Sequence, residues 1–303
     1  MAHIYIFSPS SAVRDKAAFR RGVKRLKALG HDVEIDEAVL ACQMRFAGDD
    51  ATRIAAIGRA AASGADIALI SRGGYGLTRI LPGLPYKAIA KAIDGGTQFV
   101  GLSDFTAFNQ AVLAQTGRIT WQGPALGEDF GPADEPDDIM LACFDDLVAE
   151  QGEGAGWQRP KSDTAVQARA HDAVLWGGNL SVLASLLGTP YFPQIDKGVL
   201  FLEDVGEHPY RIERMLTQLL HAGVLARQKA IVLGQFSHFK LVPAHDKGFK
   251  LDTVVAWLRS QIKTPVLTGL PFGHVPTKVL LPVGAKVDLV TEGRDALIVW
   301  GHL

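Results

Sequence analysis

Short apolar runs alternate with longer amphipathic stretches through the first half of the chain. The apolar runs are rich in β-branched residues, which predicts strands, and they are IYIFSPS, HDVEID, ADIALIS, TQFVGLS and RITWQGP. The longer stretches place apolar residues at helical spacing, and the clearest are VRDKAAFRRGVKRLKALG, ATRIAAIGRAAAS, PYKAIAKAI, DFTAFNQAVLAQTG and DDIMLACFDDLVAEQ. This alternation predicts a parallel sheet that is covered by helices on both faces.

The first predicted helix has a start signal and a stop signal. Ser8, Ser10 and Ser11 precede it, and serine is a favoured residue at the N-cap of a helix. Gly30 follows its last turn, a position where glycine commonly ends a helix. We therefore expect a serine of this segment to cap the helix and Gly30 to terminate it.

The second half of the chain mixes predicted strands with predicted helices. The segments are GVLFLEDV, PYRIERMLTQLLHAG, KAIVLGQF, DTVVAWLRSQI, KVLLPVGAKVDLV and DALIVWG. Residues 151–170 lose the apolar periodicity and gather glycine, proline and polar residues, which is typical of a connection between domains. We therefore predict an α/β protein with an N-terminal parallel-sheet domain at residues 1–150, a connection at 151–170 and a smaller C-terminal α/β domain at 171–303.

Composition and charge narrow the range of partners. The chain has 303 residues, and its 31 lysines and arginines nearly balance 32 aspartates and glutamates, so no strong field would attract a nucleic acid or an acidic membrane. No apolar run approaches the roughly 20 residues of a membrane-spanning helix. The N-terminus lacks the pattern of a secretory signal, and Cys42 and Cys143 form no disulfide framework or thiolate zinc motif. These features predict a cytoplasmic protein that acts on a small molecule.

Ser103 is the first candidate for chemistry. It lies where the run TQFVGLS meets the helical pattern DFTAFNQAVLAQ, at the sheet edge where open α/β sheets bind ligands. The position is analogous to the nucleophile elbow of α/β-hydrolases, although Asp104 stands where those enzymes have a small residue. A serine before a helix is also a common N-cap. From position alone, both a nucleophile and a helix cap stay open.

The segment RGGYG, residues 72–76, follows the preceding predicted strand. Its glycines could present backbone N–H groups to an anion or to a developing oxyanion. The alternative is a tight connection that binds nothing. The segment does not match the dinucleotide-binding pattern G-x-G-x-x-G, and the chain has no P-loop motif, so no nucleotide cofactor is predicted.

A serine nucleophile needs a base, and the base needs an orienting carboxylate. Of nine histidines, His274 is framed by Gly273 and Pro276 after an apolar run, as in a rigid turn. Glu203 ends the apolar run GVLFLE, where its carboxylate could emerge from a strand, although acids before a helix also favour its dipole. No HExxH motif or histidine cluster is present, so neither a metal nor another cofactor is predicted.

Five segments together resemble the LD-carboxypeptidase family, which also contains the microcin-immunity peptidases. They are RGGYG, GLSDFTA, WGGNLSVLASLLGTPY, LFLEDVGEHPYRIERML and PFGH, in the order in which the family has them. The resemblance implies an N-terminal domain like a class I glutamine amidotransferase or flavodoxin sheet, joined to a smaller C-terminal α/β domain. It also implies a Ser-Glu-His triad that is assembled from both domains.

Carried over to this sequence, the resemblance makes Ser103 the nucleophile, His274 the general base and then acid, and Glu203 the orienting carboxylate. Backbone N–H groups of Asp104 and Gly74 are the candidates for the oxyanion hole, with Gly73 as a near alternative. Substrate-binding candidates, chosen only because they lie within family-like segments, are Asn179, Arg211 and Arg214.

The implied reaction is release of the terminal D-alanine from the L,D bond of a muropeptide tetrapeptide in peptidoglycan recycling. Cleavage of peptide-nucleotide or acyl-adenylate antibiotics, as by the immunity peptidases, is the alternative within the family. A non-catalytic ligand-binding module is the alternative outside it. The sequence leaves open whether free or nucleotide-linked muropeptide is preferred, which third residue is required, and whether the protein forms a homodimer.

Overall fold

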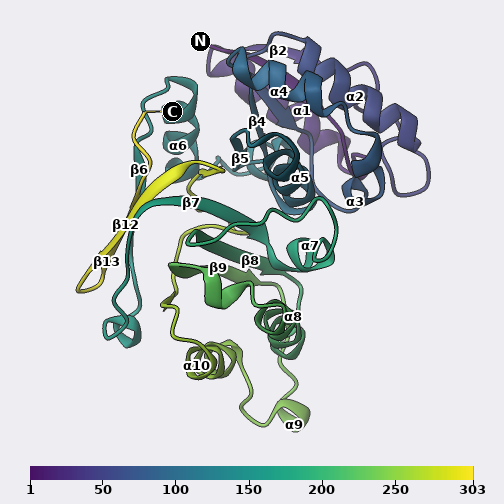
Figure 1. Ribbon diagram of the computed structural model, residues 1–303. Helices are drawn as coiled ribbons and strands as arrows, with labels where there is room; N and C mark the ends of the chain where they lie inside the picture. The colour runs from purple at the N-terminus through teal and green to yellow at the C-terminus, as the bar shows by residue number, and fades with distance from the viewer. Residues whose placement is uncertain (303) are drawn as a thin grey trace. The chain divides into compact units, whose positions relative to one another are not determined.

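The computed structural model describes residues 1–302, and these residues form two compact units. Unit 1 comprises Met1–Gly152, Thr189–Pro193 and Pro276–Gly284. Unit 2 comprises the other described residues, 153–188, 194–275 and 285–302. Each unit contains one β-sheet with its own helices (Figure 1).

Unit 1 contains a six-stranded sheet in the order β11-β5-β4-β3-β1-β2. Its strands are β1 (His3–Phe7), β2 (Asp32–Ile35), β3 (Ile67–Ile70), β4 (Gln98–Gly101), β5 (Thr120–Gln122) and β11 (Leu281–Val283). Strands β1 to β5 pair in parallel, and all five were predicted. The sheet is nevertheless mixed, because β11 pairs antiparallel with β5. The prediction of a purely parallel sheet was therefore wrong at this edge, which a distant part of the chain supplies.

The strand order places a topological switch between β1 and β3. The chain leaves β1 toward β2 on one side, and β3, β4 and β5 follow on the other. Loops after β1, β3 and β4 therefore emerge at the same edge of the sheet, where open α/β sheets bind their ligands. These loops begin at residues 8, 71 and 102. They contain, in turn, residues 8–11, which we call the serine-rich segment, then RGGYG, and then Ser103.

Five helices of unit 1 match the amphipathic stretches of the sequence, whereas the short helix at Leu77–Ile80 was not predicted. The helices are α1 (Lys16–Ala28), α2 (Asp50–Ala62), α3 (Leu77–Ile80), α4 (Tyr86–Asp94), α5 (Thr106–Thr116) and α6 (Asp138–Val148). Asp15, not a serine, caps α1, because its carboxylate accepts bonds from the N–H groups of Ala17 and Ala18 at 2.9 and 2.8 Å. Gly30 has a φ of 90° just after the C-cap, as the stop signal predicted.

Unit 2 contains a seven-stranded mixed sheet in the order β10-β9-β8-β7-β12-β13-β6. The strands are β6 (Gly154–Gln158), β7 (Arg169–Asn179), β8 (Val199–Val205), β9 (Ala230–Ser237), β10 (Val266–Leu267), β12 (Lys286–Glu292) and β13 (Asp295–Val299). Residues 151–170, expected to be an irregular connection, contain β6 and the start of β7. Their alternate glycines and polar residues suit an edge strand that is buried on one face only.

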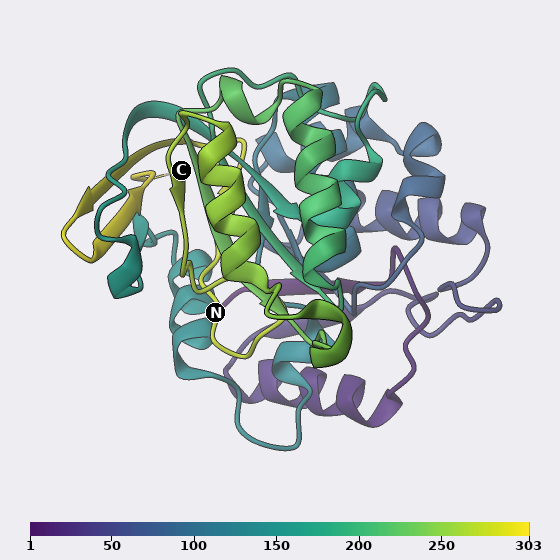
Figure 2. The ribbon, with the colours of Figure 1, turned by 90° about the horizontal axis from the view of Figure 1, so that it is seen from below.

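The described part of unit 2 contains four α-helices, namely α7 (Leu180–Ser185), α8 (Pro209–His221), α9 (Pro243–Asp246) and α10 (Leu251–Gln261). Helices α8 and α10 lie side by side against the sheet (Figures 1 and 2). Their buried residues, such as Leu216 and Leu258, recur at helical spacing on one face. In the part of the chain described here, no helix is both long enough and apolar enough to cross a bilayer.

Candidate active site

Ser103 lies in a strained backbone conformation directly after β4. Its φ is 67°, in the left-handed region that residues with a side chain rarely adopt. A 3₁₀ turn, η2 (Ser103–Phe105), begins there and leads into α5. No side chain caps either helix, so the interpretation of Ser103 as a helix cap is wrong. Strain of this kind at a strand-to-helix turn is typical of a nucleophile elbow, which turns the hydroxyl outward.

The glycine-rich loop packs against Ser103. A Cβ added to Gly73 would lie 2.7 Å from the Ser103 Cβ and 3.1 Å from its Oγ, so only glycine fits there. Gly74 has a φ of 103°, and a Cβ there would lie 2.3 Å from the Ser11 Oγ. The same Ser11 hydroxyl accepts a bond from the Tyr75 N–H at 3.0 Å. The serine-rich segment thus acts as a support for this loop.

Asp104 ties the three loops together through its side chain. Its carboxylate accepts a bond from the Ser10 hydroxyl at 2.8 Å and from the Leu77 N–H at 2.9 Å. Burial raises the pKa of this carboxyl above its ordinary value, and the two hydrogen bonds oppose that shift. Only the backbone N–H of Asp104 was predicted to belong to the site. Its side-chain role had one signal, an acidic residue where elbow motifs have a small one.

In unit 2, Glu203 and His274 form the hydrogen-bonded pair that was predicted as base and orienting group. The Nδ1 of His274 lies 2.8 Å from the Oε2 of Glu203, which is fully buried within β8. Gly273 has a φ of 142°, and a Cβ there would approach the Gln235 carbonyl oxygen to 2.9 Å. Glycine at this position therefore lets the imidazole lie beside the strand that carries Glu203.

Asn179 and Asp204 surround the buried Glu203. The amide Nδ2 of Asn179 donates to the Glu203 Oε1 at 3.1 Å and to the Asp204 Oδ1 at 3.0 Å, while its Oδ1 caps α7 through the Val182 N–H. Burial, with the nearby Glu203 charge, raises the pKa of Asp204 to about 6, against opposing hydrogen bonds from Val205, Ser181 and Asn179. Asp204 was not among the predicted site residues, and its signal in the sequence was a second acid at the end of an apolar run.

The two predicted substrate-binding arginines lie on the exposed side of α8. Arg211 and Arg214 are one helical turn apart, and both side chains are exposed. Arg211 forms an ion pair with Glu207, one turn before it. The pairing holds the pKa of Arg211 above its ordinary value, chiefly through the hydrogen bond to Glu207.

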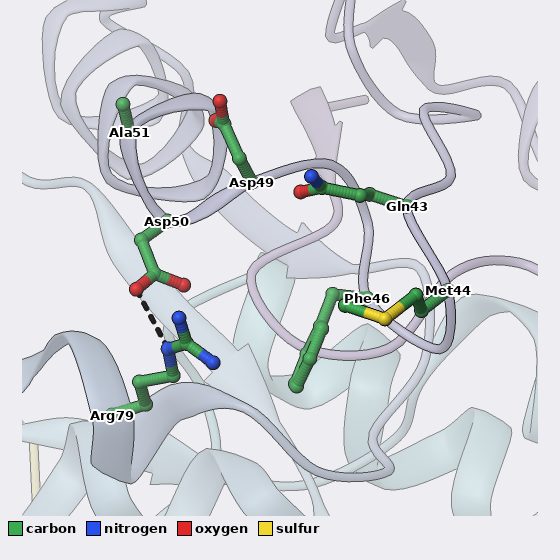
Figure 3. Close-up of a pocket in the computed structure, with 7 residues that line it drawn as sticks. All are labelled: Gln43, Met44, Phe46, Asp49, Asp50, Ala51 and Arg79. Carbon is green, nitrogen blue, oxygen red and sulfur yellow. Dashed lines mark hydrogen bonds and ion pairs between the residues drawn. The ribbon is translucent and has the colours of Figure 1, made fainter.

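A pocket in unit 1 lies apart from these residues (Figure 3). Its volume is about 290 Å³, and it is lined by Gln43, Met44, Phe46, Asp49, Asp50, Ala51 and Arg79. The guanidinium of Arg79 is engaged there, because its Nε donates to Asp50 at 2.7 Å. Among residues 1–302, no group of three or more histidine, cysteine or acidic side chains is arranged to hold a metal ion.

Two family models match the chain. The N-terminal domain of LD-carboxypeptidases matches residues 4–123, and the C-terminal domain of LD-carboxypeptidases matches residues 172–289. The chain is also similar to a protein of Bacillus subtilis (strain 168) named "Probable murein peptide carboxypeptidase". The two are 31% identical over 90% of this chain and 84% of the relative.

Solved structures agree with this assignment. The crystal structure of muramoyltetrapeptide carboxypeptidase from Oxalobacter formigenes has a TM-score of 0.87 and 38% identity, and the match covers 99% of this chain and 98% of that one. The microcin C7 self-immunity protein MccF in complex with aspartyl sulfamoyl adenosine has a TM-score of 0.86 and 25% identity, over 99% and 96% of the two chains. The similar structures therefore include both a muramoyltetrapeptide carboxypeptidase and a microcin self-immunity protein.

Proposed function

We propose, since this chain belongs to the LD-carboxypeptidase family, that it is a serine peptidase that releases the terminal D-alanine from muropeptide tetrapeptides. The family assignment makes it a carboxypeptidase and thus a hydrolase. Similarity to proteins named for murein peptides and muramoyltetrapeptides supports the choice of substrate. We also infer that unit 1 belongs with the flavodoxin-like and class I amidotransferase sheets, as its strand order suggests.

The proposed mechanism uses Ser103, His274 and Glu203 as one triad. The Oγ of Ser103 attacks the carbonyl carbon of the L,D bond while His274 accepts the hydroxyl proton. The C–N bond then breaks, His274 gives the proton to the departing amine, and D-alanine leaves. Water, activated by His274, hydrolyses the ester on Ser103 and releases the tripeptide. Since Glu203 accepts the Nδ1 proton of His274, Nε2 is the nitrogen that would exchange protons with the substrate.

Backbone N–H groups would stabilise the oxyanion of each tetrahedral intermediate. Asp104 and Gly74 are the proposed donors, and Gly73 is the near alternative. Support comes from the packing of the glycine-rich loop on Ser103 and from the anchoring of that loop by Ser11. A preorganised donor of this kind is worth roughly 10²–10³ in rate.

One observation carries the proposal, namely the positive φ of Ser103 at a strand-to-helix turn where its side chain caps no helix. A conformation of this kind costs about 1–3 kcal/mol. We propose that the cost is retained because it presents the nucleophile. The cytoplasm is the proposed compartment, in keeping with two cysteines that are both free thiols.

The test is release of D-alanine from a muropeptide tetrapeptide, followed by mass spectrometry. Ser103→Ala should reduce turnover by about 10⁴–10⁶ without loss of fold. Ser260→Ala is the matched control and should retain activity, because it removes an exposed hydroxyl that only donates to the carbonyl of Trp257 and accepts from the neighbouring Gln261 amide. Full activity of the Ser103 variant would remove this serine from the mechanism.

Two rival functions are separated in the same assay. If the wild type leaves every tetrapeptide intact and instead cleaves an aminoacyl sulfamoyl adenosine, the chain acts like the immunity peptidases. If it binds a muropeptide but cleaves neither compound, a ligand-binding module is the remaining interpretation. A binding-only outcome would leave the strain at Ser103 without a purpose.

A further inference from the structure

Arg72 opens the glycine-rich loop, and its guanidinium uses few of its hydrogen-bond donors. Nη1 donates to the carbonyl oxygen of Ala12 at 3.2 Å. Nε is buried and has no hydrogen-bond partner, and within residues 1–302 Nη2 makes no hydrogen bond either. A guanidinium carries five N–H donors, and a buried donor without a partner is costly. The arrangement therefore points to a ligand that would supply acceptors.

The carboxylate nearest to Arg72 does not saturate it. The Oε1 of Glu128 lies 3.8 Å from the Arg72 Nε, beyond hydrogen-bond distance, and the Glu128 side chain is 44% exposed. A loose pair that solvent can screen contributes little. Arg79, by contrast, donates its Nε to Asp50 at 2.7 Å (Figure 3), and Arg211 pairs with Glu207. Arg72 thus keeps a charge and donors that these other arginines have already committed.

The Arg72 guanidinium also lies beside the groups proposed for acyl transfer. A Cβ added to Gly74 would be 3.8 Å from its Nη2, and Gly73 packs on the side chain of Ser103. All these residues belong to unit 1. The cation therefore flanks the loop that is proposed to hold the scissile carbonyl oxygen.

A carboxypeptidase substrate brings a negative charge to this distance. Three covalent bonds separate the scissile carbon from the carboxylate carbon of the last residue, so the two lie within about 4 Å of each other. A planar guanidinium matches a carboxylate with two parallel hydrogen bonds. We propose that Arg72 binds the terminal carboxylate of the D-amino acid that is released, and so restricts cleavage to the last peptide bond. This assignment rests on the proposed function.

The experiment compares two tetrapeptides, one ending in a free carboxylate and one ending in a carboxamide. The wild-type protein should prefer the free acid in kcat/KM by roughly 10- to 100-fold, the scale of charge-assisted hydrogen bonds. Arg72→Gln should lose most of that factor with the acid and change within about threefold with the amide, because only the acid uses the guanidinium. Arg72→Lys should keep part of the preference, since it restores the charge without the fork.

Arg79→Gln is the matched control and should keep the wild-type ratio of the two substrates. The two proposals fail in different ways. A wild-type protein that releases no D-alanine contradicts the proposed function itself. An active wild type whose preference for the acid survives in Arg72→Gln overturns the assignment of Arg72 alone. Equal losses on both substrates would also overturn it, because they would show a structural role in the loop.

Discussion

Ser103 and His274 are held in place by different means. In unit 1 the backbone positions the serine. Ser103 has a positive φ, and there is no space for a side chain at Gly73 or Gly74. In unit 2 side chains position the histidine: Glu203 bonds to His274 and is in turn bonded by Asn179, next to a second buried carboxyl.

The difference suits the two chemical roles. A nucleophile must stay at a fixed angle to its carbonyl, and backbone strain fixes that angle without further partners. A base is protonated and deprotonated twice in each turnover, so it needs a carboxylate that stabilises the charged imidazole. Substitutions in unit 1 should therefore lower activity by steric displacement, whereas substitutions in unit 2 should lower it by removing charge or hydrogen bonds.

The largest effect should come from breaking the pair in unit 2. Glu203→Ala should lower turnover of the tetrapeptide by about 10⁴, and His274→Ala by about 10⁶. The double variant should be no worse than His274→Ala, because the pair acts as one unit. Single-turnover kinetics on all three proteins measure this. Losses that multiply in the double variant would show two independent roles and would contradict a shared triad.

A smaller effect should follow from a single methyl group in unit 1. Gly73→Ala should reduce kcat by about 10²–10³, because the new Cβ would displace the Ser103 side chain or the proposed oxyanion donors. Gly58→Ala is the control, since its Cβ would meet nothing within 4 Å. If Gly73→Ala turns over as fast as Gly58→Ala, the close packing at Ser103 has no part in catalysis.

The buried Asp204 carboxyl in unit 2 predicts that stability depends on pH. Burial raises its pKa from 3.8 to about 6 in the folded protein. Its contribution to stability is thus full below pH 3.8 and is lost as pH rises through 6. Between pH 4.5 and 7.5 the free energy of unfolding of the wild type should fall by about 2 kcal/mol relative to that of Asp204→Asn. Urea unfolding at both pH values measures this difference. Parallel pH curves would contradict the raised pKa, and Asp252→Asn, at an exposed site, is the control.

The smallest effect concerns Asn179. Its amide donates to Glu203 and Asp204 and its oxygen caps α7, so Asn179→Ala should lower kcat about tenfold and destabilise the fold by about 1–2 kcal/mol. KM should stay close to the wild-type value if the residue only positions Glu203. A large rise in KM with unchanged kcat would instead support the substrate contact that was predicted from the sequence.

Much of the first sheet was predictable because local pattern and topology agree there. The five parallel strands and, except for α3, the helices between them follow from hydrophobic periodicity and glycine stops such as Gly30. The prediction that a serine caps α1 was wrong because several residues that can cap a helix precede it. Asp15 lies directly before the first turn and is the one that caps it. Strand β6 was missed because glycine-rich alternation in an edge strand resembles a connection.

Within the candidate site, the residue types were easier to predict than their neighbours. Ser103, Glu203 and His274 were selected through motifs, and the hydrogen bond between the last two is present. The left-handed conformation of Ser103, the buried Asp204 and the unused donors of Arg72 depend on long-range packing. Nearby sequence indicates them only weakly, because some of their contacts come from distant segments, such as Asn179 for Asp204 and Ala12 for Arg72.

Strand β11 has a consequence for how the protein is made. Leu281 pairs with Gln122, and the ribosome synthesises β11 only after β10 of unit 2. The first sheet is therefore incomplete at this edge until β11 has been made. Until then β5 is an open edge, available for wrong pairing with other chains. A truncated product ending near residue 152 would keep that edge permanently, and its aggregation would say nothing about the stability of the loops that carry Ser103.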